Sequence, residues 1–228
     1  MKAMLLAAGR GERLRPLTDS LPKALVEVRG KPLAVRHLER LAATGYREVV
    51  INVSHLAERV VARLGDGSAF GLAIRYSREE IPLETAGGLA RARALLGDAP
   101  FLLVNADLFC DYDFVRLRDR ALGAGLAHLV LVPNPPHHAT GDFSLADGRV
   151  GNSGAPRYTY AGIAVVSPAL VADVAAGARA PLAPLLRAAA DRGQLSGELY
   201  QGLWTDVGTA ERLAELETKM VANDAARR

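Results

Sequence analysis

Glycines and basic residues are concentrated in one short segment near the N-terminus, directly after an apolar run. Gly9 and Gly11 follow the run from Ala3 to Ala8. Glycines at the end of a buried strand let the backbone approach a phosphate closely and offer unhindered N–H donors. Positive charge for a small polyanion is supplied nearby by Arg10, Arg13, Arg15 and Lys23. The segment therefore predicts a binding site for the phosphates of a nucleotide.

Two common glycine motifs for phosphate binding are absent from this segment. The dinucleotide fingerprint Gly-x-Gly-x-x-Gly fails because Leu14 stands where the third glycine belongs, and the Walker pattern fails because no Gly-Lys-Ser/Thr follows. A dinucleotide-binding oxidoreductase is therefore disfavoured, although it would share the α/β pattern. Two glycines alone would favour a surface turn with solvated arginines.

Two aspartates follow apolar runs and are candidate ligands for a hard cation. Asp107 comes shortly after the run Phe101–Val104, and Asp206 comes two residues after Trp204. Taken singly, Asp107 could form a turn and Asp206 could cap the last helix, although Thr209 is at least as good a cap. Mg²⁺ is usually held by one or two carboxylates together with substrate phosphate oxygens. The aspartates would serve one ion only if the fold brings the two strand ends together.

The spacing around the glycines resembles the signature of the sugar-1-phosphate nucleotidylyltransferase family. The matching residues are Gly9, Gly11, Arg13, Pro16 and Thr18, followed by Pro22 and Lys23. The resemblance extends over essentially the whole chain. It implies an enzyme that transfers a nucleotidyl group from a nucleoside triphosphate to a sugar 1-phosphate and releases pyrophosphate. Those two substrates are then the expected partners, with no nucleic acid and no membrane.

The resemblance also implies roles for individual residues. Arg13 and Lys23 are expected to be catalytic, and Asp107 and Asp206 to bind Mg²⁺. The expected nucleotide-binding residues are Ala8, Gly9, Gly11, Arg13, Lys23, Glu84, Gly87 and Gly88. The expected residues for the sugar phosphate are Asn105, Asp142 and Gly162.

This chain departs from the family pattern at two places. Ala106 stands where glycine is usual, and alanine would cost about 1 kcal/mol if that position required a positive φ. The Glu-Lys-Pro segment of many relatives is missing, and residues 152–157 stand roughly in its place.

Within the family, several segments resemble the N-acetylmuramate-1-phosphate uridylyltransferases of bacterial cell-wall recycling. These segments are 1–4, 82–85, 103–107, 111–114, 141–143 and 204–209. Mannose-1-phosphate guanylyltransferases share the general signature and are the alternative, as is a non-catalytic sugar-nucleotide-binding regulatory subunit. Retention of both aspartates and of Lys23 disfavours the regulatory subunit. A lactyl-bearing sugar would add a carboxylate to the ligand, for which Arg157 and Arg187 are candidate partners.

The elements that must position these residues follow from hydrophobic periodicity. Short apolar runs, including 3–8, 49–53 and 101–104, predict buried strands, and 33–44, 56–64, 88–96, 181–191 and 209–221 predict helices. Further strands are expected over 129–132, 158–166 and 199–204, with a hairpin around Asp147 and Gly148.

Strands alternating with helices predict a single-domain, Rossmann-like, three-layer α/β sandwich with a mostly parallel mixed sheet over residues 1–228. The sequence shows no hexapeptide repeat, so we expect no C-terminal β-helix domain. Ligands of such a sheet bind beyond the carboxyl ends of its strands, which is where the glycines and both aspartates are expected.

Composition limits the classes of function. The net charge is only +3, and basic residues are interspersed with acids, which disfavours nucleic-acid binding as the main role. Cys110 is the single cysteine and is expected to be a small buried residue in a reducing compartment. No apolar run approaches the length of a membrane span, so we expect a cytoplasmic protein. His137 and His138 predict a solvated loop, and the oligomeric state stays open.

Overall fold

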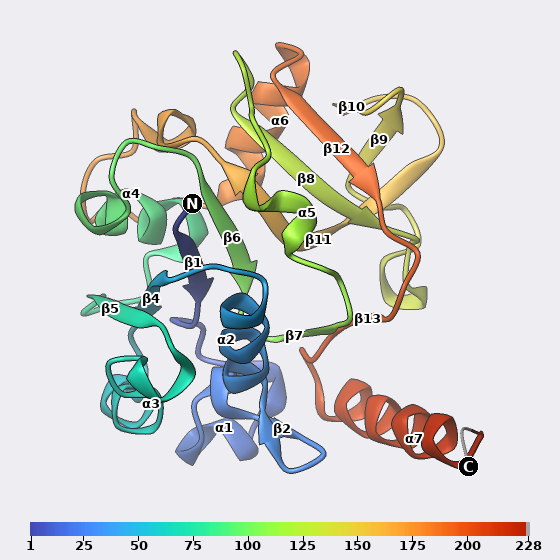
Figure 1. The fold of residues 1–228 in the computed structure, drawn as a ribbon. Helices are drawn as coiled ribbons and strands as arrows, with labels where there is room; N and C mark the ends of the chain where they lie inside the picture. The colour runs from blue at the N-terminus through green and yellow to red at the C-terminus, as the bar shows by residue number, and fades with distance from the viewer. Residues whose placement is uncertain (227–228) are drawn as a thin grey trace.

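The computed structural model describes residues 1–226, and within them nine strands form one mixed sheet (Figure 1). The strand order is β5-β4-β1-β6-β11-β8-β12-β10-β9. The bounds are β1 Ala3–Leu6, β4 Glu48–Val53, β5 Ala73–Arg78, β6 Phe101–Asn105, β8 Ala127–Val132, β9 Phe143–Ala146, β10 Arg149–Gly151, β11 Arg157–Val166 and β12 Leu195–Leu199. The predicted hairpin is β9–β10, and both Asp147 and Gly148 have a positive φ.

The first half of the sheet is parallel, and its strand ends are level. β1 lies between β4 and β6 and pairs in parallel with both. Leu6, the last residue of β1, is in register with Asn52 on one side and Asn105 on the other. The loops that leave these three strands therefore begin side by side, which brings residues far apart in the sequence to one edge of the sheet.

Helices cover both faces of the sheet, as the alternation of elements predicts (Figure 1). Ala3 and Leu5 pack into the same core as α2 (Leu33–Ala43) and α3 (Ala57–Leu64). Met4 points to the opposite face and packs with α4 (Glu84–Leu96) and α6 (Leu182–Asp191). Because successive strand residues face opposite sides, a fully apolar strand is stable only when both faces are covered. The predicted three-layer α/β architecture is confirmed.

Helix α4 begins at Glu84, four residues earlier than predicted, and therefore contains Gly87 as well as Gly88. Glycine has low intrinsic helix propensity. Close packing nevertheless requires glycine at position 87. A Cβ on Gly87 would lie 2.2 Å from the carbonyl oxygen of Ala178. The close approach between α4 and the chain at 178–180 outweighs the propensity.

The predicted strand from Leu199 to Trp204 is wrong. β12 ends at Leu199, and a separate strand, β13 (Trp204–Asp206), pairs antiparallel with β7 (Leu108–Cys110) outside the main sheet. Asp206 therefore does not extend beyond a strand of the main sheet. It reaches the end of β6 through this ribbon, opposite Leu108.

The last helix, α7 (Ala210–Ala226), packs against the ribbon and the N-terminal loops. Leu213, Leu216 and Met220 form the predicted contact face. The Oγ1 of Thr209 accepts a hydrogen bond from the backbone N–H of Arg212 at 3.3 Å, so Thr209 is the cap and Asp206 is not needed for that role. The remaining elements are β2 Glu27–Val28, β3 Lys31–Pro32, α1 Leu17–Ser20 and α5 Val115–Arg118.

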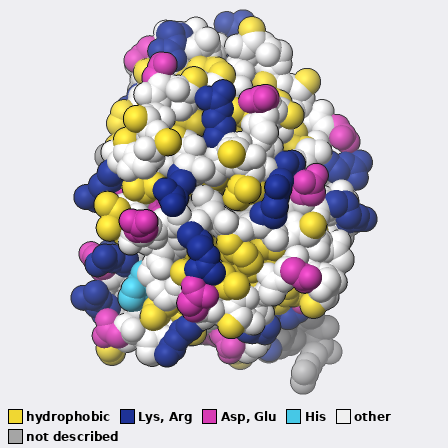
Figure 2. Space-filling model, turned by 90° about the vertical axis from the view of Figure 1, so that its left-hand side faces the viewer, with side chains coloured by type: hydrophobic (Ala, Val, Ile, Leu, Met, Phe, Trp, Pro, Cys, Tyr) yellow, Lys and Arg dark blue, Asp and Glu magenta, His cyan; other side chains and the backbone are white. Residues whose placement is uncertain are grey.

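The distribution of surface charge and the burial of Cys110 agree with what the composition predicts. On the face beside β5, Lys and Arg side chains are interspersed with acidic and apolar ones (Figure 2). No helix within residues 1–226 is long and apolar enough to cross a membrane. Cys110 is buried, and burial raises the pKa of its thiol, so the predicted role as a small buried residue is confirmed.

Candidate active site

A cavity of about 320 Å³ lies beyond the carboxyl ends of β1, β4 and β6. It is lined by the end of β1 and its loop, by the start of α4 and by the residues after β6. The lining includes Ala8, Gly9, Lys23, Glu84, Asn105 and Asp107, all expected from the sequence to contact substrates. We call it the central cavity.

The glycine loop after β1 depends on Gly11 for its shape. Gly11 has a φ of 68°, and a Cβ there would lie 2.8 Å from Cγ2 of Thr18. The Thr18 hydroxyl donates to the Gly11 carbonyl at 2.7 Å and closes the loop. Gly9 differs, because a Cβ there would meet nothing within 4 Å. Its lack of a side chain leaves free space over the backbone that lines the central cavity.

Asp107 is paired with Lys23. The Lys23 ammonium donates to Oδ2 of Asp107, and both side chains are largely buried. Asp107 is held by its neighbours, because its carbonyl accepts from the N–H of Val207 at 2.8 Å. Ala106 does not have a positive φ, so the strain expected if it replaced an obligatory glycine does not arise.

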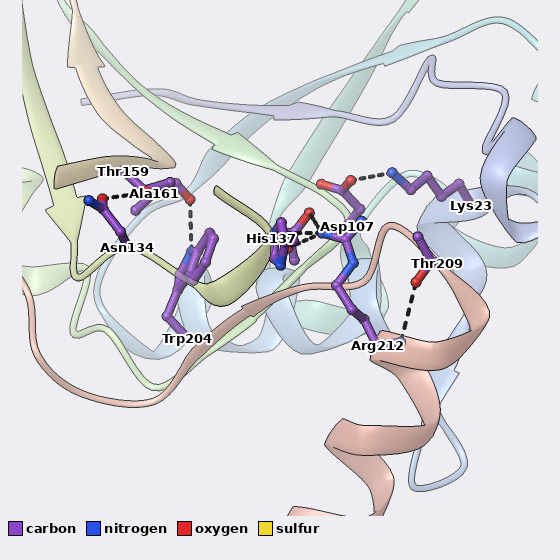
Figure 3. A network of polar contacts seen from close by, with 10 residues as sticks. Lys23, Asp107, Asn134, His137, Thr159, Ala161, Trp204, Thr209 and Arg212 are labelled. Carbon is purple, nitrogen blue, oxygen red and sulfur yellow. Dashed lines mark hydrogen bonds and ion pairs between the residues drawn. The ribbon is translucent and has the colours of Figure 1, made fainter. Parts of the chain in front are cut away.

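Asp206 is held by a second cation, from α7. Nη1 of Arg212 lies 2.6 Å from both carboxylate oxygens of Asp206, and Nε2 of His137 lies 3.3 Å from Oδ1 (Figure 3). His137 is exposed and His138 is partly exposed, as expected for a solvated loop, but both side chains also contact carboxylates. His137 contacts Asp206, and Nε2 of His138 lies 3.0 Å from Oδ1 of Asp142.

The two aspartates share a second cavity of about 450 Å³, which we call the acidic cavity. Its lining includes Arg13, Asn105, Asp107, Gly162, Asp206 and Arg212. Among the side chains of residues 1–221, no three of His, Cys, Asp or Glu are grouped closely enough to hold a metal by themselves. Two carboxylates beside a substrate cavity do fit a divalent ion that completes its coordination with phosphate oxygens. The residues present therefore suit Mg²⁺ of the substrate-bridged type.

A buried polar network supports the central cavity and was missed by the sequence analysis. Asn52 accepts from the N–H of Ala7 at 2.9 Å and donates to Oε1 of Glu79 at 2.7 Å. The other oxygen of Glu79 accepts from the N–H of Leu83 at 2.9 Å. Asn52 and Glu79 are both about 95% buried. A polar residue inside the apolar run 49–53 was the available signal, because buried polar groups need partners.

Of the three residues at the start of α4 that were predicted to bind the nucleotide, only Glu84 lines the central cavity. Glu84 lines the central cavity and forms an ion pair with Arg179 at 2.9 Å. Gly87 and Gly88 are not among the lining residues. A Cβ on Gly88 would lie 2.8 Å from Glu79 Oε1 and 2.9 Å from Asn52 Nδ2, so Gly88 makes room for the buried network.

Asn105 lies where the cavities meet. It lines the central and acidic cavities and a third one that also contains Asp142. Gly162 sits at a bulge in β11 with a φ of 74°, and a Cβ there would lie 2.7 Å from Nδ2 of Asn105. The Asp142 carboxylate accepts from the N–H of Tyr160 at 2.8 Å. Gly162 thus permits the position of Asn105.

Arg13 and Arg212 complete the positive side of the site. Arg13 lines the acidic cavity and also an outer cavity with Arg10, Gly11 and Gly208. Arg212 was not predicted, because nothing in the sequence of a surface helix distinguishes it from other arginines. It reaches the site only because α7 packs against the β7–β13 ribbon.

Comparison with known proteins agrees with this geometry. The family model for nucleotidyl transferases matches residues 2–144. The chain is 47% identical to an N-acetylmuramate alpha-1-phosphate uridylyltransferase of Neisseria meningitidis serogroup B, over 95% of this chain and 97% of that protein. It is 36% identical to the enzyme of the same description from Caulobacter vibrioides, over 96% of each chain. A catalytic subunit beta of mannose-1-phosphate guanylyltransferase from Danio rerio is 31% identical over 91% of this chain, which spans 61% of that protein.

Solved structures share the fold at low sequence identity. A Bacillus anthracis protein assigned as a glucose-1-phosphate thymidylyltransferase, crystallised with sucrose, has a TM-score of 0.85 at 20% identity, covering 96% of this chain and 94% of that one. HddC from Yersinia pseudotuberculosis, complexed with GMP-PN, has a TM-score of 0.77 at 19% identity, covering 96% of this chain and 99% of that one. The family match over residues 2–144 and the full-length relatives together show that the chain belongs to the nucleotidyl transferase family, whose enzymes transfer nucleotidyl groups to sugar 1-phosphates.

Proposed function

We propose that this protein transfers UMP from UTP to N-acetylmuramate 1-phosphate, with Mg²⁺ as cofactor, and releases pyrophosphate. The observation that carries the substrate assignment is the 47% identity to a uridylyltransferase of that specificity over nearly the full length of both chains. The guanylyltransferase relatives are more distant, and this chain spans only 61% of their length. The product would be a nucleotide sugar for cell-wall recycling.

The reaction needs positioning and charge neutralisation more than acid–base catalysis. An oxygen of the sugar phosphate attacks the α-phosphorus of UTP, a new P–O bond forms there, and the bond to the β-phosphate breaks with pyrophosphate leaving. The nucleophile is already anionic near neutral pH, because the second pKa of a phosphate is about 6. No general base is required, which fits a site without a Ser/His/Asp arrangement.

Each residue of the site then has a role in that reaction. The central cavity takes the nucleotide, and the backbone at Gly9 and Gly11 donates to its phosphates. Arg13 and Lys23 stabilise charge that moves toward the leaving pyrophosphate. Asp107 and Asp206 would hold Mg²⁺, which supplies neutralisation of phosphate charge when it is bound.

The sugar phosphate would occupy the acidic cavity, beside Asn105 and Gly162. No Glu-Lys-Pro segment is present to hold it. We assign that role to Arg212, which lines the acidic cavity beside Asp206. We place the reaction in the cytoplasm, because a single free cysteine fits a reducing compartment.

The test compares kcat/KM for UTP with N-acetylmuramate 1-phosphate and for GTP with mannose 1-phosphate, measured by pyrophosphate release. We expect the first pair to be favoured at least about tenfold, which corresponds to roughly 1.4 kcal/mol in transition-state binding. A preference for the GTP pair would overturn the assignment of the substrates but would leave the assignment of the reaction class unchanged. Binding of sugar nucleotides without turnover of any pair would instead favour the regulatory subunit.

A further inference from the structure

A third cavity opens beside the central one and has no role in the reaction described above. Its volume is about 310 Å³, and it shares Glu84, Thr85 and Asn105 with the central cavity. We call it the side cavity. Its far wall is apolar and includes Phe143, Leu182 and Leu186. It therefore adjoins the place of the sugar phosphate and could receive a substituent of the sugar.

One cation lines the side cavity without an ionic partner. Arg187 lies in α6, and its guanidinium carbon is 5.4 Å from the centre of the Phe143 ring. Its Nη1 makes only a long contact, 3.4 Å, to the carbonyl oxygen of Asp142. Among the side chains of residues 1–221, no carboxylate forms an ion pair with Arg187.

The acids that line the side cavity are already engaged. Glu84 is paired with Arg179 at 2.9 Å. The carboxylate of Asp142 contacts His138 at 3.0 Å through Oδ1 and accepts from the N–H of Tyr160 at 2.8 Å through Oδ2. Arg187 is therefore the charged side chain of the side cavity that has no ionic or hydrogen-bonded side-chain partner among residues 1–221.

Two further features of the wall favour an anion. Helix α6 begins at Leu182 after Pro181, and no side chain caps its first turn. The N–H groups of a first helical turn lack intrahelical acceptors and carry partial positive charge. Tyr160 also lines the side cavity, and its hydroxyl is a buried donor without a hydrogen-bond partner in the described part of the chain.

The other arginine suggested by the sequence is committed elsewhere. Arg157 donates to the carbonyl oxygens of Asn152, of Asp142 at 2.7 Å and of Thr140 at 3.3 Å. These bonds tie together the loops around β9 and β11, so Arg157 has a structural role. The structure thus separates two residues that the sequence could not distinguish.

We propose that Arg187 is the specificity-determining residue that recognises the carboxylate of the lactyl group of N-acetylmuramate 1-phosphate, with Leu186 and Phe143 receiving the methyl group. A lactyl ether carries one methyl group and one carboxylate, which matches an apolar wall with one unpaired guanidinium. This inference rests on the proposed function, because it names the part of the site that reads the sugar.

The test measures dissociation constants by titration calorimetry for UDP-N-acetylmuramate and UDP-N-acetylglucosamine, which differ only in the lactyl group. The proteins are the wild type and the variants Arg187→Met and Arg192→Met. Arg192 is an exposed arginine at the end of the same helix, whose Nε contacts Gln194 at 2.7 Å, so it is a matched control.

We expect the wild type and Arg192→Met to prefer the lactyl-bearing ligand. Arg187→Met should weaken its binding at least about tenfold, which corresponds to about 1.4 kcal/mol, because it removes a charged hydrogen bond to the carboxylate. The affinity for the other ligand should stay within about twofold. Arg187→Lys should recover part of the loss, because it restores the charge without the planar fork.

Three results would overturn the assignment. Equal weakening of both ligands would show that Arg187 acts on the fold of the site, and an unchanged preference would show that it does not read the lactyl group. In both cases a wild type that turns over UTP with N-acetylmuramate 1-phosphate would leave the proposed function standing. A wild type that does not turn over this pair would overturn the proposed function and the inference together.

Discussion

Replacement of Asn52 by alanine is the most informative perturbation of the fold around the site. The carboxamide of Asn52 has two partners, the N–H of Ala7 and the carboxylate of Glu79, at 2.9 and 2.7 Å. Alanine would leave the N–H of Ala7 and Oε1 of Glu79 without this partner at positions that are almost fully buried, while the other oxygen of Glu79 keeps the N–H of Leu83. The variant therefore tests whether this network holds the loop after β1 against α4.

The expected cost follows from the two groups that are left unsatisfied. An unpaired buried polar group costs about 1–3 kcal/mol, and a charged one costs more. Since both groups border the central cavity, water can replace part of the loss, so we expect a decrease of about 3 kcal/mol in the free energy of unfolding. For a chain of this size that corresponds to a fall in Tm on the order of 10 °C.

The assay is equilibrium unfolding in urea, combined with the KM for UTP. The KM should rise as well, because the loop that carries Gly9 and Gly11 is anchored through the N–H of Ala7. Gln201→Ala removes an exposed carboxamide and serves as the control. A loss below about 1 kcal/mol for Asn52→Ala, equal to that of the control, would refute the argument that these hydrogen bonds stabilise the site.

Three further predictions concern catalysis and pH. Lys23→Ala should lower kcat by about 10²–10³-fold with the fold intact, as judged by circular dichroism, and an unchanged kcat would contradict the role of Lys23. Asp107→Asn and Asp206→Asn should each remove most Mg²⁺-dependent activity and be strongly non-additive, because both serve one ion; a double variant that loses the product of the single losses would argue for separate roles. Burial lowers the pKa of His37 to about 4 from 6.5. The unfolded chain therefore takes up this proton at higher pH than the folded chain, so stability should fall as the pH drops from 6.5 to 4, by on the order of 3 kcal/mol. His37→Gln should flatten that dependence in unfolding measured across this pH range.

The reaction class was predictable because the spacing of Gly11, Arg13 and Lys23 resembles the signature of the family. Gly11 and Asp107 also lie within a few residues of an apolar run, and such local patterns can be recognised from the sequence alone. The level ends of β1 and β6 then bring Asp107 beside the glycine loop, as a parallel sheet requires. The three-layer fold followed from the same alternation of strands and helices.

The errors occurred where packing overrides local preference. Gly87 lies inside α4, where a larger residue would collide with Ala178, although the helix was predicted to begin only at Gly88. Asp206 belongs to a two-stranded ribbon with β7, whose partner strand is remote in the sequence. Periodicity describes how buried a strand is but does not state with which strand it pairs.

By itself, the sequence determined the α/β architecture, because hydrophobic periodicity depends on neighbours along the chain, and its resemblance to the family nominated the glycine loop and the two aspartates as site residues. Only the tertiary structure decided which of the many arginines line the candidate site. Arg212 contacts Asp206 because α7 packs on the β7–β13 ribbon. Arg157 donates its hydrogen bonds to backbone carbonyls, whereas Arg187 lines the side cavity. The physical reason is that an arginine has the same charge and reach wherever it stands. Its role is set by the partners that folding places within a few ångströms of its guanidinium.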